Sequence, residues 1–212
     1  MMKYIFLFII SLSTSYSNTV FAKHVSPIGI VTSITGDVKI TRDDKEAPTP
    51  ITIGKAIHLN DTITTINDGS YIRIDFIDQT HISLSDEGAE LTIDEYTFDP
   101  ENLDGNTARF EILRGSFEFV GGLLDKGKEE NVQIDLDFGS IGIRGTHIHR
   151  TMKDKECWIY LQSGEIHVFN DGGSVTLTPG QSTRISDKSI SPAPAEKWSK
   201  EKIEWIKSQT SR

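Results

Sequence analysis

The sequence has very little cysteine: Cys157 is the only one among its 212 residues. A single thiol excludes an internal disulfide, so core burial and backbone pairing must hold the folded chain together. Cys157 stands beside Trp158 in an alternating segment. This pattern favours a small buried apolar side chain. Pairing with a second chain is the alternative.

The sequence also lacks any block of charge of one sign. Its 31 acidic and 22 basic residues are interspersed and give a formal net charge of −9. Binding to a phosphate backbone requires a clustered basic surface. We therefore expect no nucleic-acid partner, and the acidic balance indicates solubility.

Long apolar runs are missing after the first residues of the chain. Residues 4–10 (YIFLFII) follow Lys3 and lead into Val20-Phe21-Ala22. This run has about half of the roughly 20 residues that a spanning helix needs. A short basic start, an apolar middle and small residues at the end are typical of a signal peptide. We predict a signal peptide over residues 1–22 with cleavage after Ala22, a periplasmic or secreted protein, and no membrane-spanning segment after cleavage.

Short alternating segments fill most of the remaining chain. In residues 70–76, Ile72, Ile74 and Phe76 fall on one face of a strand. The flanking residues 67–69 (NDG) and 78–80 (DQT) favour tight turns, so a hairpin with residues 81–84 is expected.

The same pattern recurs along the chain, with glycine-containing breaks between short runs. The predicted strands cover residues 30–34, 38–41, 110–113, 117–120, 132–138, 158–161, 166–169 and 175–177. Roughly twelve strands at this spacing indicate an all-β fold. We predict one domain over residues 23–190, coiled as a β-solenoid or β-roll, with a β-sandwich as the alternative.

The last residues depart from the β pattern. Residues 191–194 (SPAP) form a proline-containing linker, and residues 195–208 have the spacing of an amphipathic helix that carries Trp198, Trp205 and Ile206. The linker and the helix together form the third predicted segment of the chain, residues 191–212, after the signal peptide and the β domain. A helix of about fourteen residues is marginal alone in water, so it needs a surface to dock on. We expect the tryptophans to pack against the β domain; a partner-binding or membrane-touching helix is the alternative.

Three stretches together resemble the FecR-domain family of bacterial envelope proteins. They are residues 54–65, residues 68–84, and residues 141–146 (IGIRGT) followed by 161–168 and 177–181, and they occur in family order. Residues 78–80 read Asp-Gln-Thr where the family commonly has Asp-Gly-Ser, so the turn there is less favourable.

The resemblance implies an exported β module. The best-known members relay a signal from an outer-membrane receptor to a cytoplasmic sigma factor, and they use a cytoplasmic segment ahead of one spanning helix. This sequence shows neither feature, so we expect no sigma-factor control. The expected function is non-catalytic binding, scaffolding or sensing through contact with another envelope protein or a cell-wall component.

Gly142, Arg144 and Gly145 form an unusual run within a predicted strand. Glycine inside a strand usually marks a bulge or a close backbone approach. Arg144 is expected to bind backbone carbonyls at a bend there, and binding of a ligand carboxylate is the alternative.

Histidines give the only candidate for metal chemistry. His147 and His149 alternate, so both imidazoles face one side of a strand, and His167 lies on a nearby predicted strand. The alternative function is therefore a metal-binding protein or metal-dependent β-barrel enzyme that uses His147, His149 and His167. The sequence places no carboxylate at ligand spacing, and Arg150 is adjacent. We accordingly predict no catalytic, cofactor or metal residues, with acid sensitivity of the histidine pair as a further hypothesis.

Overall fold

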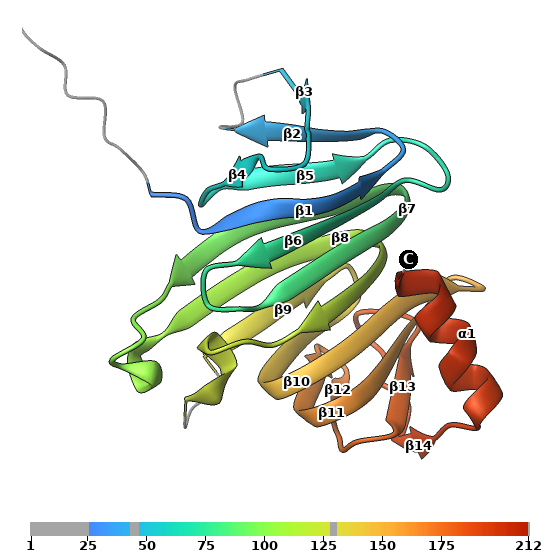
Figure 1. Cartoon of the computed structure of the whole chain (residues 1–212). Coiled ribbons are helices and arrows are strands. Elements are labelled where there is room, and N and C mark those ends of the chain that lie inside the picture. Colours follow the sequence, from blue (N-terminus) through green and yellow to red (C-terminus); the bar gives the residue numbers. More distant parts are fainter. Residues whose placement is uncertain (1–25, 43–46, 128–130, 212) are drawn as a thin grey trace, which may run out of the picture.

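A computed structural model describes residues 26–42, 47–127 and 131–211 of the chain (Figure 1). The predicted signal peptide and its cleavage point lie outside these residues. The strands are β1 (Gly29–Thr35), β2 (Val38–Arg42), β3 (Thr49–Pro50), β4 (Ala56–Ile57), β5 (Asp61–Thr65), β6 (Tyr71–Phe76), β7 (His81–Thr97), β8 (Thr107–Val120), β9 (Val132–Leu136), β10 (Gly139–Lys153), β11 (Glu156–Asn170), β12 (Gly173–Leu177), β13 (Gln181–Ile185) and β14 (Glu196–Lys197). Two short 3₁₀ helices, η1 (Leu103–Gly105) and η2 (Leu124–Lys126), and one α-helix, α1 (Lys200–Thr210), complete the described part.

The strands belong to one sheet whose main path runs β14-β13-β11-β10-β9-β8-β7-β5-β2-β3. Pairing is antiparallel except between β8 and β9. The four long strands β7, β8, β10 and β11 each change neighbours halfway along. In β7, for example, residues 81–85 pair with β6, whereas residues 90–92 pair with β5.

This change of neighbours divides the sheet into two layers. The first layer contains β2, β3, β5, β9 and β12 with the adjoining halves of the long strands. The second layer contains β1, β4, β6, β13 and β14 with the other halves.

Strand β8 shows that the two layers face each other. The rings of Phe110 and Phe119 lie 6.2 Å apart, centroid to centroid. Nine residues of straight strand would separate them by about 30 Å. Both rings are buried in one hydrophobic cluster, which draws side chains from both layers. The sheet is therefore rolled around a single core, and the prediction of an all-β fold with a short C-terminal helix is confirmed.

Glycines allow the long strands to bend between the layers. Gly115 in β8 has a φ of +81°, and a Cβ there would lie 2.1 Å from the Cβ of Ala89 in β7. Gly164 in β11 has a φ of +88°, and its Cβ would lie 2.3 Å from the carbonyl oxygen of Gly145 in β10. Neighbouring strands thus bend at the same level and pack backbone against backbone, which a side chain would prevent.

Several sequence predictions are corrected at these bends. Residues 110–113 and 117–120 form one continuous strand, as do residues 158–161 and 166–169. A single left-handed glycine bends a strand and need not reverse it. β1 and β2 are consecutive in the sequence but do not pair with each other: β1 pairs with β6 and β2 with β5.

Other local predictions hold. The hairpin of residues 70–84 is present as β6–β7, and Gln79 in its turn adopts a φ of +74°, which glycine would adopt with less strain. The ladder between β10 and β11 is irregular around Gly145, which confirms a bulge there, whereas Gly142 sits in regular pairing opposite His167. Cys157 is fully buried, as predicted.

The arginine expected to clamp the bend is the wrong one. Arg144 is exposed and lies opposite Glu165 in the ladder. Arg150 is instead completely buried, and its guanidinium donates to the carbonyl oxygen of Gly115. Its Nε also lies 3.2 Å from the Sγ of Cys157. The bulge that follows Arg144 shifts the alternation of β10, which turns Arg150 towards the core.

The C-terminal helix is shorter than predicted and begins later. Residues 196–197 form β14, which pairs with β13, so α1 starts only at Lys200. Trp198 is 8% exposed and packs with Tyr160 and the buried Ile206, with Trp205 at the edge of this cluster. The prediction that the tryptophans pack against the β domain is confirmed. Among the described residues, neither α1 nor the 3₁₀ helices have the length and apolar character needed to cross a bilayer.

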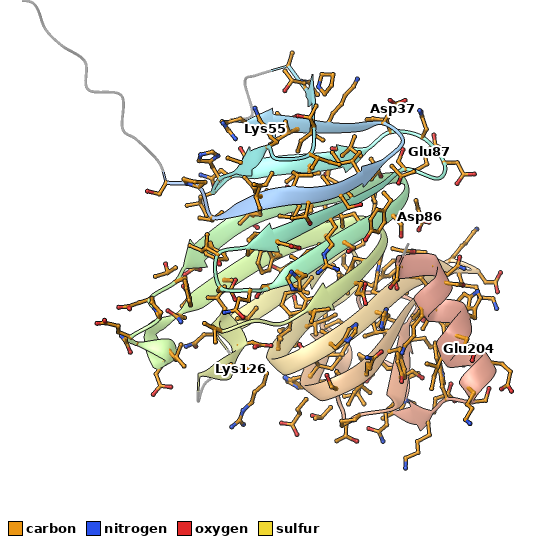
Figure 2. The ribbon with its side chains drawn as sticks, viewed as in Figure 1. Asp37, Lys55, Asp86, Glu87, Lys126 and Glu204 are labelled. Atoms are coloured by element: carbon orange, nitrogen blue, oxygen red, sulfur yellow. The ribbon has the colours of Figure 1, made fainter. Side chains whose placement is uncertain are left out.

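Charged side chains lie around the periphery of the rolled sheet. Figure 2 shows Asp37, Lys55, Glu87, Lys126 and Glu204 on loops, bends and the outer side of α1. Both signs are mixed there, in agreement with the interspersed charges of the sequence.

Candidate functional site

A cluster of one carboxylate and two imidazoles lies on the outer face of the second layer. It consists of Glu118 from β8 and His147 and His149 from β10, whose potential ligand atoms all lie within 4.8 Å of one another. The Nε2 of His147 is 2.7 Å from the Oε1 of Glu118, and the Nε2 of His149 is 3.9 Å from the same oxygen. We call these three residues the Glu-His-His cluster.

The cluster confirms only part of the predicted histidine set. His147 and His149 share one face, with ring centroids 4.8 Å apart. His167 does not join them: it lies opposite Gly142 in the ladder, and its ring stacks on Phe169 at 5.3 Å. The missing carboxylate is supplied by Glu118, which sequence reasoning did not find. Alternation in Phe117-Glu118-Phe119 predicts that Glu118 faces outward, but only the pairing of β8 with β10 sets it opposite His149.

The last turn of α1 is bound directly to this cluster. The Oγ1 of Thr210 lies 2.7 Å from the Nδ1 of His149, and the hydroxyl of Ser211 donates to the Oε2 of Glu118 over 2.9 Å. The hydroxyl of Ser85 in β7 donates to the carbonyl oxygen of Gln209 over 2.6 Å. Polar contacts therefore fix the C-terminal end of α1, in addition to the apolar contacts of Ile206.

These contacts bear on the position of the proton on the His149 ring. The Thr210 hydroxyl lies 3.3 Å from the carbonyl oxygens of Ile206 and Lys207, to which it can donate its one proton. When the proton goes to these carbonyls, the Thr210 oxygen accepts the Nδ1–H of His149; when it goes to Nδ1, the ring carries its proton on Nε2. The Nδ1–H tautomer leaves a lone pair on the buried Nε2 of His149, which makes no hydrogen bond with the described residues although the Gln162 amide lies nearby.

Burial and charge shift the pKa values of the cluster. Burial, together with the charges of His147 and Lys207, lowers the pKa of His149 to about 4, against the opposing effects of Glu118 and the Gln162 amide. For Glu118, burial acts to raise the pKa, but hydrogen bonds from His147 and Ser211 outweigh it and lower the pKa below its usual value. At neutral pH a neutral His149 therefore stands beside an ionised Glu118.

These shifts predict a loss of stability in mild acid. Because the pKa of His149 is about 4 in the folded protein and 6.5 as its ordinary value, the unfolded chain takes up a proton first as the pH falls. The associated stability is present above about pH 6.5 and is lost towards pH 4. The lowered pKa of Glu118 adds a further loss of folding stability at still lower pH. Urea unfolding of the metal-free protein between about pH 7.5 and 4.5 should show a decrease of about 2 to 3 kcal/mol from His149.

His149→Gln provides the reference for that experiment, since its side chain does not titrate. The stability of this variant should be lower at neutral pH and should fall less on acidification than that of the wild type. Equal pH dependence in the two proteins would show that His149 does not contribute in this range.

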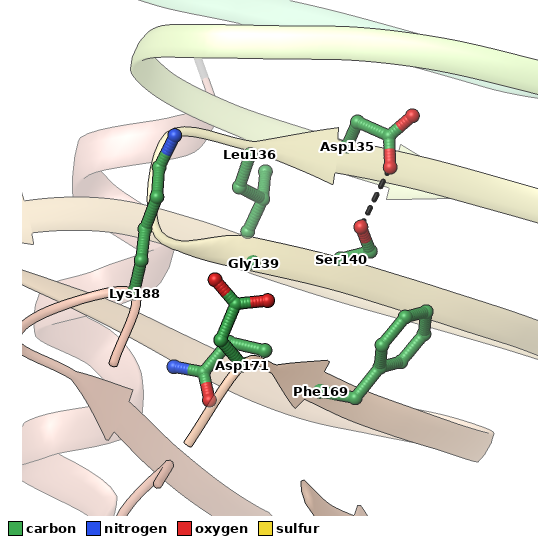
Figure 3. Close-up of a pocket in the computed structure, with 8 residues that line it drawn as sticks. Asp135, Leu136, Gly139, Ser140, Phe169, Asp171 and Lys188 are labelled. Carbon is green, nitrogen blue, oxygen red and sulfur yellow. Dashed lines mark hydrogen bonds between the residues drawn. The ribbon is translucent and has the colours of Figure 1, made fainter. Parts of the chain in front are cut away.

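A second candidate feature is a polar pocket of about 380 Å³ at one end of the first layer (Figure 3). It lies where the β9–β10 and β11–β12 hairpins come together. Its lining consists of Asp135, Leu136, Gly139, Ser140, Phe169, Asn170, Asp171 and Lys188.

Asp135 in this pocket is fully engaged in hydrogen bonds. It accepts from Ser140 at 2.6 Å, as the dashed line in Figure 3 marks, and from Gln133 at 2.7 Å and Arg109 at 2.5 Å. Burial acts to raise its pKa, but these hydrogen bonds and the charge of Arg109 lower it overall. A carboxylate held in this way suits a fixed recognition surface better than proton transfer.

The β11–β12 hairpin also forms an open edge of the first layer. β12 pairs with β11 on one side, and no other strand of the described residues pairs with it. Its sequence, Gly-Ser-Val-Thr-Leu, has no charge and no proline. The side chains of Ser174 and Thr176 are exposed, whereas Val175 and Leu177 face the core.

Comparison with known proteins gives a limited result. No protein-family model and no curated protein matches the sequence. Two crystal structures of a "putative anti-sigma factor" from Parabacteroides distasonis, at 1.65 and 2.50 Å resolution, are similar to the chain, each with a TM-score of 0.49. Sequence identities are 13% and 14%, over 68% of this chain in both cases and 63% and 62% of the matched chains. The chain thus spans less than two thirds of the length of either structure.

Proposed function

We propose that this protein is an exported, non-catalytic contact module of the FecR-domain type, which binds an extended segment of another envelope protein along the outer edge of β12. The observation that carries this proposal is the character of that edge. The other ends of the two layers carry the two-residue strands β3, β4 and β14. β12 instead has five residues without a second strand partner in the described part of the chain, and only its first residue, Gly173, lies against Ser191.

Open edges normally carry a feature that prevents strand addition. Very short strands, lysines, prolines and bulges all serve this purpose. β12 has none of these features, and its exposed side chains are the small hydroxyls of Ser174 and Thr176. An extended peptide can therefore form backbone hydrogen bonds along it, as in β-augmentation.

The pocket in Figure 3 supplies a basis for specificity beside this edge. Phe169 and Asn170 belong to the end of β11, and Asp171 leads directly into β12. In strand addition, backbone bonds provide affinity and adjacent pockets select side chains. Asp171 and Lys188 give this pocket both charge signs, so a polar side chain of the bound segment fits it better than an apolar one.

The FecR assignment is supported by where the family-like stretches lie in the fold. Residues 68–84 form the β6–β7 hairpin, and residues 141–146 and 161–168 contain the paired bends at Gly145 and Gly164. These stretches thus provide the turns and bends that roll the sheet. The proposed module lies in the periplasm or is secreted, and it acts by contact without controlling a sigma factor.

Site-specific photo-crosslinking from position 176, in cells that produce the protein, tests this proposal. We expect one protein partner, crosslinked through an extended segment, and we expect a synthetic peptide of that segment to bind the purified protein. Ser174→Lys with Thr176→Lys should weaken peptide binding at least about tenfold, because each adds a charge at the edge.

Thr35→Lys with Thr52→Lys is the matched control, since both residues are exposed and lie outside the first-layer edge of β12. This pair should leave binding unchanged. Crosslinks to wall polymer or lipid alone would contradict the protein-partner proposal. Capture of a sigma-factor regulator would contradict the proposal that the protein does not control a sigma factor.

A further inference from the structure

The Glu-His-His cluster has the composition and spacing of a metal site. We propose that Glu118, His147 and His149 bind one divalent transition-metal ion, through the Oε1 of Glu118 and the Nε2 atoms of the two histidines. Two imidazoles and one carboxylate form a common ligand set for Zn²⁺ and related ions. This site is separate from the β12 edge and does not depend on the function proposed for that edge.

The buried side of the cluster has one nitrogen, the Nε2 of His149, that makes no hydrogen bond with the described residues. The lone pair on the Nε2 of His149 points away from Thr210 and lies 3.9 Å from the Oε1 of Glu118. His149 is 1% exposed, so bulk water does not reach its ring. A buried lone pair without a partner is unfavourable, and a cation between the Nε2 of His149 and the Oε1 of Glu118 would satisfy it, although Glu118 already accepts from His147.

Gln162 adds a further acceptor beside the same ring. The β10–β11 ladder passes from His147 opposite Ser163 to Ile148 opposite Leu161, so Gln162 is the extra residue of a bulge. Its Oε1 is buried and has no hydrogen-bond partner among the described residues. The amide oxygen can serve as an additional ligand, whereas a rotated amide would instead donate its NH₂ group to His149.

Hydrogen bonds from neighbouring side chains hold the proposed ligands in place. Thr210 holds the Nδ1 of His149, and Ser211 holds the second oxygen of Glu118. His147 currently donates from Nε2 to Glu118 over 2.7 Å. On metal binding the His147 proton moves to Nδ1, so that Nε2 becomes a ligand and no net proton is released.

The cluster also has a route of entry. The side chain of His147 is 20% exposed and that of Glu118 16% exposed, whereas His149 lies at the bottom beneath the end of α1. Three protein ligands leave a coordination position open on the exposed side. Because Thr210 and Ser211 belong to the end of α1, a bound ion should also tighten the docking of this helix.

Calorimetric titration of the full chain, stripped with a chelator, with Zn²⁺ tests the proposal. We expect binding of one ion per chain and a Zn²⁺-dependent rise in melting temperature. His147→Gln and Glu118→Gln should each weaken affinity at least about tenfold, and Thr210→Val should do so by about ten- to a hundredfold through the His149 tautomer. A Co²⁺ spectrum of the wild type, altered in His147→Gln, would identify the coordinating nitrogen.

His167→Gln is the matched control, because His167 lies outside the cluster. It should bind Zn²⁺ like the wild type. Absence of stoichiometric binding, or equal affinity in the wild type and in folded His147→Gln, would overturn the proposal.

Discussion

Replacing Gly115 by alanine is expected to lower the free energy of unfolding by about 2 to 5 kcal/mol. The φ of +81° is strained for any residue with a Cβ. A methyl group would also stand 2.1 Å from the Cβ of Ala89 and 2.9 Å from the carbonyl oxygen of Ser85, both in the neighbouring strand. β7 and β8 must separate at the bend to admit it. Equilibrium urea unfolding measures the loss.

Gly54→Ala separates strain from packing in this experiment. Gly54 has nearly the same φ, +84°, but no atom lies within 4 Å of the position of its Cβ. Its substitution should cost only about 1 to 2 kcal/mol. If the two variants lose the same stability, the close backbone packing at the bends does not contribute to the fold.

Replacing Ile206 by aspartate is expected to release α1 from the sheet. Ile206 is fully buried against Tyr160 and Trp198. Loss of this apolar contact and burial of a carboxylate should disfavour docking by about 3 kcal/mol or more. An undocked helix of 11 residues does not persist in water. Amide hydrogen exchange should show loss of protection throughout α1 while the sheet stays protected, and tryptophan emission should shift to the red.

Ser208→Asp controls for the added charge near the end of the helix. Ser208 is exposed on the same last turns, so both variants place a carboxylate at the unfavourable end of the helix dipole. This control should keep α1 protected. Unfolding of the whole protein in Ile206→Asp would show that the helix is an integral part of the β domain and not a docked element.

The sequence was most informative where a residue pattern reflects its immediate neighbours. Alternation at residues 70–76 predicted the β6 strand and its buried face, and the turn residues predicted the β6–β7 hairpin. The packing of Trp198 followed from the low stability of a short helix in isolation. These features depend on local periodicity.

Where the sequence failed, the deciding contacts are distant along the chain. Gly115 lies in a gap between two predicted strands, but its close contact with Ala89 makes it a bend within one continuous strand. Likewise, Arg150 became buried because the bulge near Gly145 altered the alternation of β10. No local pattern reports which strand lies alongside another, so neither outcome could be read from residue order.

The candidate site, too, was predicted only in part: local alternation was correct, whereas contacts between distant segments were missed. Alternation correctly put His147 and His149 on one face, whereas His167 lies apart because β11 bends at Gly164 before it reaches that residue. Glu118, Thr210 and Ser211 come to the histidines through strand pairing and helix docking. The open edge of β12 could not be predicted from the sequence either, because it depends on which strands of the sheet lie next to β12.

Backbone amide exchange of β12 in the presence of the crosslinked partner's segment tests the proposed contact function most directly. We predict that amides of residues 173–177 whose N–H groups face away from β11 become protected on binding. The amides of β3, at the opposite edge of the first layer, should not change. Protection that is confined to another surface, with β12 unchanged at saturating peptide, would contradict strand addition at this edge.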